Sequence, residues 1–300
     1  MSFRSNWIRS FNQQRYRQVL EPGVDALALP LLQQRNYQFN WQYSVNYNIA
    51  KSLKVNFSAN KNSIVRNYFK TDDAISSEEI NEDAQIWDGF FDLGEPNRYS
   101  QQMQLNYQLP FDKIPFLKFM SAQYTYTSNF DWQRGGEALR QFAGSEINSV
   151  QNANTQSLVV NANFQGLYQF LGLNRGGKKG IGKTFKDALT ALKRASISFT
   201  ENKGKYIPGY TQSIGLWGTV EPSLGFVFGS QQDVRFEAAR NGYLTTFQEF
   251  NAQYLDNTNT QATLAATIQP SRSLTIDLAA DRRYNSSYSE RFQIDTADDG

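Results

Sequence analysis

Residues 37–49, YQFNWQYSVNYNI, decide the fold, because apolar and polar side chains alternate through them without exception. A β-strand points successive side chains to opposite faces, so this stretch predicts a strand with one apolar face and one face of amides and hydroxyls. Strands of soluble proteins usually have about 5–6 residues, whereas a tilted strand that crosses a bilayer needs about 9–11. The length of this stretch therefore favours a membrane-spanning strand.

The same period of two recurs along most of the chain and predicts an all-β protein of about nine to eleven antiparallel strands. The predicted strand regions are about 37–60, 99–127, 157–170, 196–203, 222–229 and 260–284.

The predicted connections fall into two length classes. Three are short, at 50–52, 110–115 and 269–273, whereas 61–98 and 133–155 are long and polar. Outer-membrane barrels have short periplasmic turns and longer extracellular loops. The pattern therefore predicts an antiparallel transmembrane β-barrel, and residues between Gly204 and Asn257 are expected to fold partly on the extracellular side.

The composition of the 300 residues excludes several classes of protein. The chain has no His and no Cys, which removes Ser–His–Asp and Cys–His catalysis, disulfides and the usual zinc sites. A net charge of +2 gives no electrostatic reason to expect nucleic acid as a partner. Charged residues make up only 19%, while 26 Asn and 27 Gln supply polarity without charge. Met1–Phe11 lacks the apolar core of a signal peptide.

A basic connector at 171–195 interrupts the strand pattern. Residues 184–195 carry apolar side chains at helical spacing, which predicts a short amphipathic helix on the periplasmic side. Residues 177–184, GKKGIGKT, match the phosphate-binding P-loop pattern. A P-loop belongs to a parallel sheet whose strands are continuously apolar, and the preceding strand alternates, so nucleotide binding is rejected.

The spacing of the acidic residues in the 61–98 connection does not indicate a calcium site. Asp72, Asp73, Glu78, Glu79, Glu82 and Asp83 lack the convergent arrangement around a glycine turn that calcium needs. We expect a solvated loop there. The sequence predicts neither a catalytic residue, nor a metal site, nor a cofactor, and indicates a protein that is not an enzyme.

Four stretches of the chain resemble the barrel of the Sov/SprA family, the outer-membrane translocon of the type IX secretion system of Bacteroidetes. They are Phe39 through Phe57, Leu109 through Trp132, Ser196 through Gly209, and Leu264 through Tyr284, in the order that the family has.

The resemblance implies a very large barrel that exports folded proteins across the cell outer membrane, with a link to gliding motility. It implies folded protein cargo, a small outer-membrane barrel that acts as shuttle subunit, a periplasmic plug protein and membrane lipid as partners. The family's proteins are several times longer than this chain, so the resemblance implies an internal fragment.

The expected orientation of the first strand follows from its two faces. The side chains expected to face the water of the pore are Gln38, Asn40, Gln42, Ser44, Asn46 and Asn48. Those expected to face lipid are Phe39, Trp41, Tyr43, Val45, Tyr47 and Ile49. Two alternatives stay open: another outer-membrane β-barrel channel or receptor for small solutes, and a soluble β-rich carbohydrate-binding domain.

Overall fold

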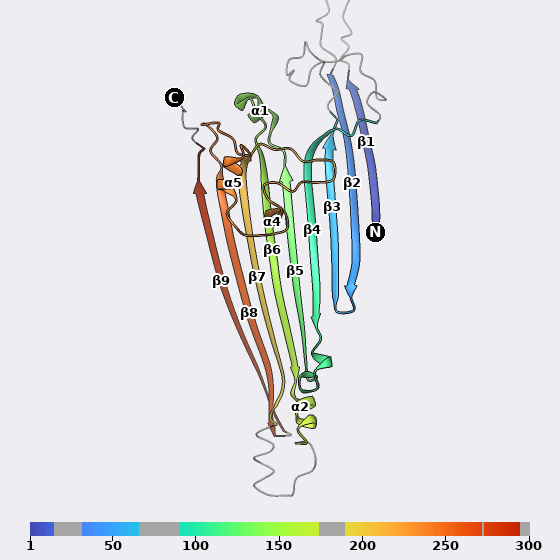
Figure 1. The fold of residues 1–300 in the computed structure, drawn as a ribbon, viewed down its shortest axis with the longest axis vertical. Coiled ribbons are helices and arrows are strands. Elements are labelled where there is room, and N and C mark those ends of the chain that lie inside the picture. The colour runs from blue at the N-terminus through green and yellow to red at the C-terminus, as the bar shows by residue number, and fades with distance from the viewer. Residues whose placement is uncertain (15–31, 66–90, 174–189, 272, 295–300) are drawn as a thin grey trace, which may run out of the picture.

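The computed structural model describes residues 1–14, 32–65, 91–173, 190–271 and 273–294, and these residues form one antiparallel sheet of nine strands (Figure 1). The strands follow one another across the sheet in the order of the chain, so every strand pairs with its neighbours in sequence. The all-β, antiparallel prediction is confirmed.

The strands are long, with 12 to 19 residues each. They are β1 (Ser2–Gln14), β2 (Leu32–Ala50), β3 (Leu53–Ile64), β4 (Glu95–Leu109), β5 (Met120–Gln133), β6 (Asn148–Asn163), β7 (Leu192–Tyr210), β8 (Gln253–Ser271) and β9 (Leu274–Arg291). The short helices are η2 (Phe111–Lys113), η3 (Pro115–Leu117), α1 (Glu137–Ala143), α2 (Phe164–Phe170), α4 (Leu224–Val227) and α5 (Arg235–Arg240).

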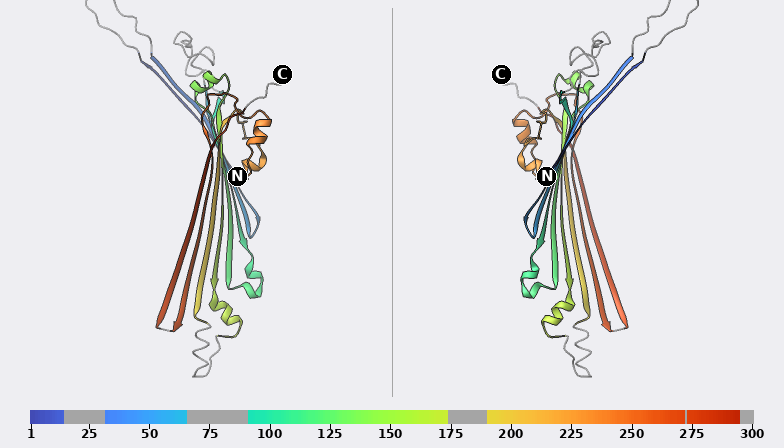
Figure 2. Two further views of the ribbon diagram at one scale, coloured as in Figure 1. Left: turned by 90° about the vertical axis from the view of Figure 1, so that its left-hand side faces the viewer. Right: turned by 90° about the vertical axis from the view of Figure 1, so that its right-hand side faces the viewer.

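The sheet is twisted and open. Figure 2 shows α4 and α5 on one side of it, and Figure 1 shows the turns at its lower end stepping down from β2–β3 to β8–β9. This stagger is what the wall of a barrel with tilted strands requires. Within the described residues β1 and β9 are edge strands and the sheet does not close, so the barrel part of the prediction stays a prediction.

Two predicted strand regions contain helices. Residues 164–170, expected at the end of a strand, form α2, because Asn163 caps the helix by accepting a hydrogen bond from the Gln165 backbone N–H at 3.2 Å. Residues 222–229, also expected as a strand, contain the single turn α4. Ser223 caps it, and Gly229 ends the turn at a φ of 89°.

Two further differences come from strand pairing. The end of the predicted helix 184–195 belongs to β7, since Leu192 pairs with Ile268 and Ala195 with Ala266. Thr190 and Ala191 are not helical, and residues 184–189 lie outside the described residues. Strand β1 was not predicted, although it pairs with β2 over its whole length, with Trp7 opposite Phe39. In the part of the chain that is described, no helix is long and apolar enough to span a membrane.

Candidate functional site

The strand register sorts the side chains of the sheet into two faces. We call the face that carries Phe39, Trp41 and Tyr43 the apolar face, and the face that carries Asn40 and Gln42 the polar face. Because directly paired residues point to the same side, the register extends both faces across all nine strands.

Amide and hydroxyl side chains bond one another across the polar face. Asn62 Nδ2 donates to Asn40 Oδ1 at 2.7 Å, and Gln102 Nε2 donates to Asn129 Oδ1 at 2.9 Å. Further along the sheet, Thr155 Oγ1 donates to Asn202 Oδ1 at 2.7 Å. These side chains are half-buried or exposed, so their remaining hydrogen-bonding capacity is open to water. The polar face is an uncharged, hydrated surface over most of its area.

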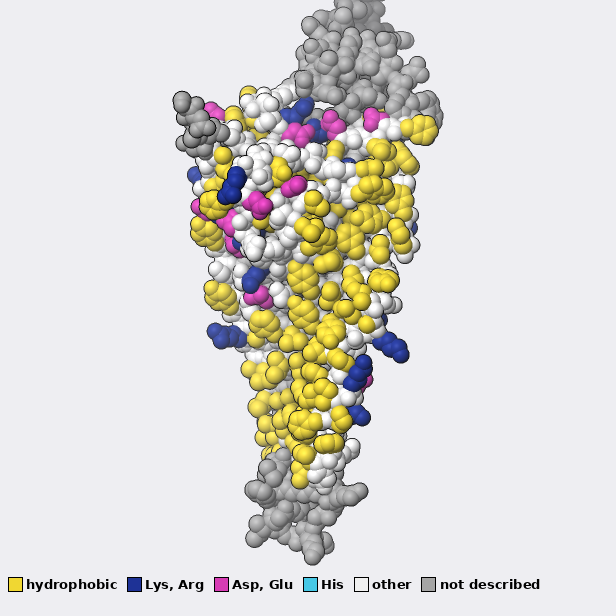
Figure 3. All heavy atoms as spheres, in the orientation of Figure 1, with side chains coloured by type: hydrophobic (Ala, Val, Ile, Leu, Met, Phe, Trp, Pro, Cys, Tyr) yellow, Lys and Arg dark blue, Asp and Glu magenta, His cyan; other side chains and the backbone are white. Residues whose placement is uncertain are grey.

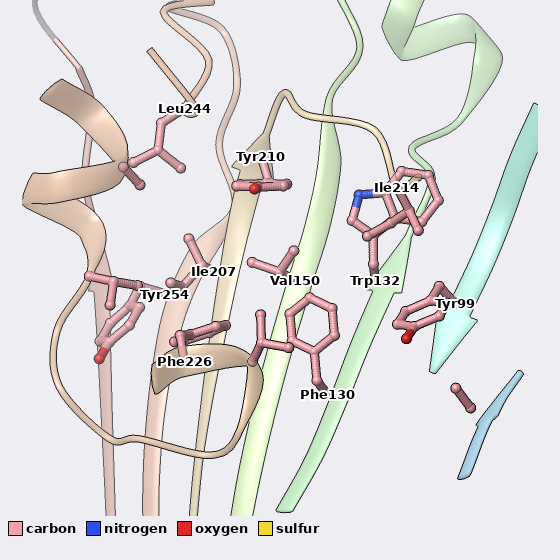
Figure 4. Close-up of a cluster of buried hydrophobic side chains, with 14 of the residues drawn as sticks. Tyr99, Phe130, Trp132, Val150, Ile207, Tyr210, Ile214, Phe226, Leu244 and Tyr254 are labelled. Atoms are coloured by element: carbon pink, nitrogen blue, oxygen red, sulfur yellow. The ribbon is translucent and has the colours of Figure 1, made fainter. Parts of the chain in front are cut away.

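The upper part of the apolar face is covered by the cap, which we define as residues 211–252, between β7 and β8. The cap contains α4 and α5, which Figure 2 shows projecting from one face of the sheet. Phe226 of the cap is fully buried and meets Phe130 of β5 edge-on, with ring centroids 6.2 Å apart. Figure 4 shows Phe226, Ile214 and Leu244 of the cap pointing toward Val150, Trp132 and Ile207 of the strands. The cap and the sheet therefore share one hydrophobic core.

Polar side chains of the apolar face hold the backbone of the cap. Asn152 Nδ2 donates to the carbonyl oxygens of Phe226 and Ser230, at 3.0 and 2.7 Å. Gln101 and Asn154 bond the carbonyls of Val227 and Gly229, and Tyr126 Oη donates to that of Phe228 at 2.7 Å. These polar residues sit at apolar positions of the alternation, and their buried amide N–H groups are bonded to cap carbonyls.

Gly229 lies at the tightest point of this contact. A Cβ at this position would be 2.7 Å from Tyr126 Oη and 2.8 Å from the Ser128 Cβ, and its φ of 89° is a conformation that L-residues rarely adopt. Only glycine allows the cap to approach the sheet so closely here.

A charged cluster fixes α5 to the last strands. The Arg235 guanidinium bonds Asp233 at 2.7 Å and Glu290 of β9 at 2.8 Å, and its centre lies 3.9 Å from the ring centroid of Tyr254. Nearby, Lys205 pairs with Asp256. The hydrogen bond from Arg235 holds the pKa of the Asp233 carboxyl below its usual value, and the same bond raises the pKa of Arg235.

Below the cap the apolar face is bare. Three adjacent cross-strand rows, which we call the apolar band, carry apolar side chains at every position except Arg282 on the edge strand β9. The first row is Leu53, Tyr107, Tyr124, Leu158, Phe199 and Ala262, and it ends at Arg282. The second is Leu109, Ala122, Val160, Ile197, Leu264 and Ala280. The third is Met120, Ala162, Ala195, Ala266 and Leu278.

The apolar band is large and continuous. Figure 3 shows the apolar side chains as one area that runs from the upper right of the sheet to its lower end. On β8 the apolar positions extend from Ala262 to Ile268, which is about 20 Å at a rise of about 3.3 Å per residue. Soluble monomers rarely expose contiguous apolar areas above a few hundred Å².

The structure divides the side chains expected to face lipid into two groups. Phe39 and Trp41 are buried in the core beneath the cap, so protein covers them, and the lipid-facing prediction is wrong for these two. Tyr43 is half-buried beside Trp217 of the cap, whereas Val45, Tyr47 and Ile49 lie below the cap, where the prediction stays a prediction.

All six side chains expected to face the pore share the polar face of β2: Gln38, Asn40, Gln42, Ser44, Asn46 and Asn48. Sequence analysis missed Gln101, Asn152 and Asn154 as contacts of the cap. The signal for them was present, because each places an amide at a position where the alternation calls for an apolar side chain.

Two features of the sequence fall outside the described residues: the P-loop-like residues 177–184 and the acidic run of the 61–98 connection. Within the described residues no group of three acidic side chains is arranged to hold a metal ion.

No protein-family model matches the chain, and a search of the curated proteins finds no relative.

Proposed function

We propose that this chain is part of the wall of a transmembrane β-barrel in an outer membrane, with the polar face toward a water-filled lumen and the apolar band toward lipid. The observation that carries the proposal is the apolar band itself, three rows in which Arg282 at the edge is the one charged side chain, backed by a polar face that is rich in amides. Barrels of this kind alternate apolar-out and polar-in and carry an apolar belt about 25 Å tall.

Burial of the band in lipid removes its apolar side chains from contact with water, which is unfavourable in free energy. Ile197, Leu264 and Leu278 are each 45–51% exposed in the chain alone. At about 25 cal/mol per Å² of apolar area, covering side chains of this size stabilises the protein by about 1 kcal/mol each. In a soluble carbohydrate-binding domain the apolar band would be exposed to water, so this alternative does not explain why the band is apolar.

We propose further that the channel conducts folded proteins in type IX secretion and takes part in gliding motility, with shuttle and plug subunits as gating partners. The resemblance of four stretches to the Sov/SprA family supports this, and so does the wide sheet of sequentially paired strands. A lumen lined by uncharged amides lets a folded cargo pass without electrostatic trapping. The alternative is a channel or receptor for small solutes, which needs the same wall.

Cysteine scanning tests the membrane wall, since the chain has no native Cys. Single cysteines at 44–49 and 262–267 of the full-length protein, in intact outer membranes, would be exposed to a water-soluble and to a lipid-soluble maleimide. We expect positions 44, 46, 48, 263, 265 and 267 to react from water and the alternate positions to react from lipid. Reaction of both sets from water would overturn the proposal.

A photocrosslinking pair tests protein conduction. Asn106 and Leu105 are adjacent on β4 and lie on opposite faces. A photoreactive side chain at Asn106 is expected to capture secreted proteins in transit, whereas the same group at Leu105 is expected to capture lipid. If conductance to small solutes persists and position 106 captures no protein during active secretion, the small-solute channel replaces the protein-conducting one.

A further inference from the structure

The cap divides its exposed side chains between two margins. Residues 216–224 expose four large apolar side chains: Leu216, Trp217, Val220 and Leu224, at 41, 63, 58 and 59%. The exposed side chains of residues 232–249 are mostly charged or polar, with Phe236 as the exception. The exposed surface of the cap is therefore amphipathic, with apolar side chains on one margin and polar side chains on the other.

The apolar margin lies beside the bare apolar side chains of β2 that lead from the cap to the apolar band. Trp217 packs against Tyr43, with ring centroids 6.4 Å apart, and Tyr43 is followed on the same face by Val45 and Tyr47. At the other end of α4 from Leu224, Phe228 packs against Phe57, and its carbonyl accepts a hydrogen bond from Tyr126. Tyr126 stands one same-face position above Tyr124 of the band, about 7 Å along the strand.

The polar margin lies away from that boundary. It contains Arg235, Asp233 and the exposed Glu237 and Arg240, and it is tied to the upper end of β9 through Glu290. Charged groups that stay in water and apolar groups that continue the band are the arrangement of an element lying in a membrane interface. Trp and Tyr are enriched at that depth, because their rings are amphipathic.

We infer that residues 216–224 dip into the outer leaflet of the bilayer, so that the cap rests on the membrane surface and the apolar side chains of this margin contact lipid. This inference rests on the proposed function. The cap is then an interfacial anchor on the lipid side of the wall, and not a plug in the lumen.

Spin labels on single cysteines test the inference in the full-length protein in outer-membrane vesicles. Labels are placed at Leu224 and Val220 on the apolar margin, at Glu237 as a polar control on the same cap, and at Leu264 in the band. Relaxation by oxygen, which partitions into lipid, is compared with relaxation by a water-soluble nickel chelate. Each labelled variant must keep the trypsin resistance of the unmodified cap.

We expect the ratio of oxygen to nickel relaxation at 224 and 220 to shift from the value at 237 toward the value at 264. A lipid signature at 264 with the water signature of 237 at positions 220 and 224 overturns the inference and leaves the membrane wall intact. Protection of 220 and 224 from both reagents, again with lipid at 264, also overturns it, because a protein partner then covers the margin. A water signature at 264 removes the proposed function itself.

Discussion

The same face of one sheet is built in two ways, under the cap and in the apolar band. Under the cap, aromatic residues such as Trp132 and Phe130 are interrupted by amides such as Asn152 and Gln101. In the band no amide interrupts the apolar side chains. A protein cover brings backbone carbonyls that need donors, whereas hydrocarbon offers no group to bond. The buried amides that bond cap carbonyls therefore mark the part of the sheet that protein covers.

The largest effect is expected from the core that the cap shares with the sheet. Phe226→Ala removes a fully buried ring, and such truncations cost about 3–5 kcal/mol. The equilibrium constant for opening of the cap should rise at least a hundredfold, since about 1.4 kcal/mol corresponds to a factor of ten. The measurement is the rate of trypsin cleavage after Arg240 on intact cells. Phe236→Ala, at a side chain 75% exposed on the same cap, is the control and should leave the rate unchanged.

A charge in the band distinguishes the bare region from the covered one. Ala266→Arg points an arginine to the apolar face between Ala195 and Leu278, which costs about 2–4 kcal/mol near the bilayer midplane. Ala265→Arg places the same residue one position along β8 on the polar face and should cost little. The yield of folded, heat-modifiable barrel in the outer membrane measures both. Equal yields for the two variants would contradict the assignment of the faces.

Removing an amide beneath the cap should destabilise the cap more than removing an amide from the polar face. Asn152→Ala removes the side-chain donor of the Ser230 carbonyl and one of the two donors of the Phe226 carbonyl, at a cost of about 1–3 kcal/mol for buried groups. Asn161→Ala removes an exposed acceptor of Ser196 on the polar face, where water replaces it. Hydrogen exchange of residues 223–231 is expected to rise in the first variant only. A similar rise in both would mean that the amides under the cap do not hold it.

The smallest effect is expected from the ion pair of α5. Because the pKa of Asp233 is lowered in the folded cap, its contribution is present above the unfolded value of about 3.9 and is lost as the pH falls through the folded value. Below pH 4 the cap should be cleaved faster by an acid-active protease. Glu290, Lys205 and Asp256 also face this cluster, so Asp233→Asn is the control, with a smaller change over the same pH range.

Local patterns predicted the sheet well because side-chain alternation is a property of each strand by itself. The alternation of residues 37–49 correctly predicted β2 and both of its faces. The predicted short connections lie where the structure has turns between strands. The same rule failed at Leu224, Phe226 and Phe228, where three alternating apolar residues form a single helical turn. Three positions are too few to establish a strand, and in the helical turn Leu224 and Phe226 lie on opposite sides, exposed and buried. The capping hydroxyl of Ser223 and the contacts beneath the turn favour the helical conformation.

The sequence by itself determined that the chain forms long antiparallel strands with one apolar and one polar face, because that information lies in the order of neighbouring side chains. Tertiary structure alone decided which part of the apolar face is covered. Phe39 and Trp41 resemble Val45 and Tyr47 in the alternation, yet the first two are buried. Phe39 packs against Trp7 of the neighbouring strand β1. Trp41 packs against Trp217 of the cap, about 175 positions later, which reaches it only after five further strands have been paired across the sheet.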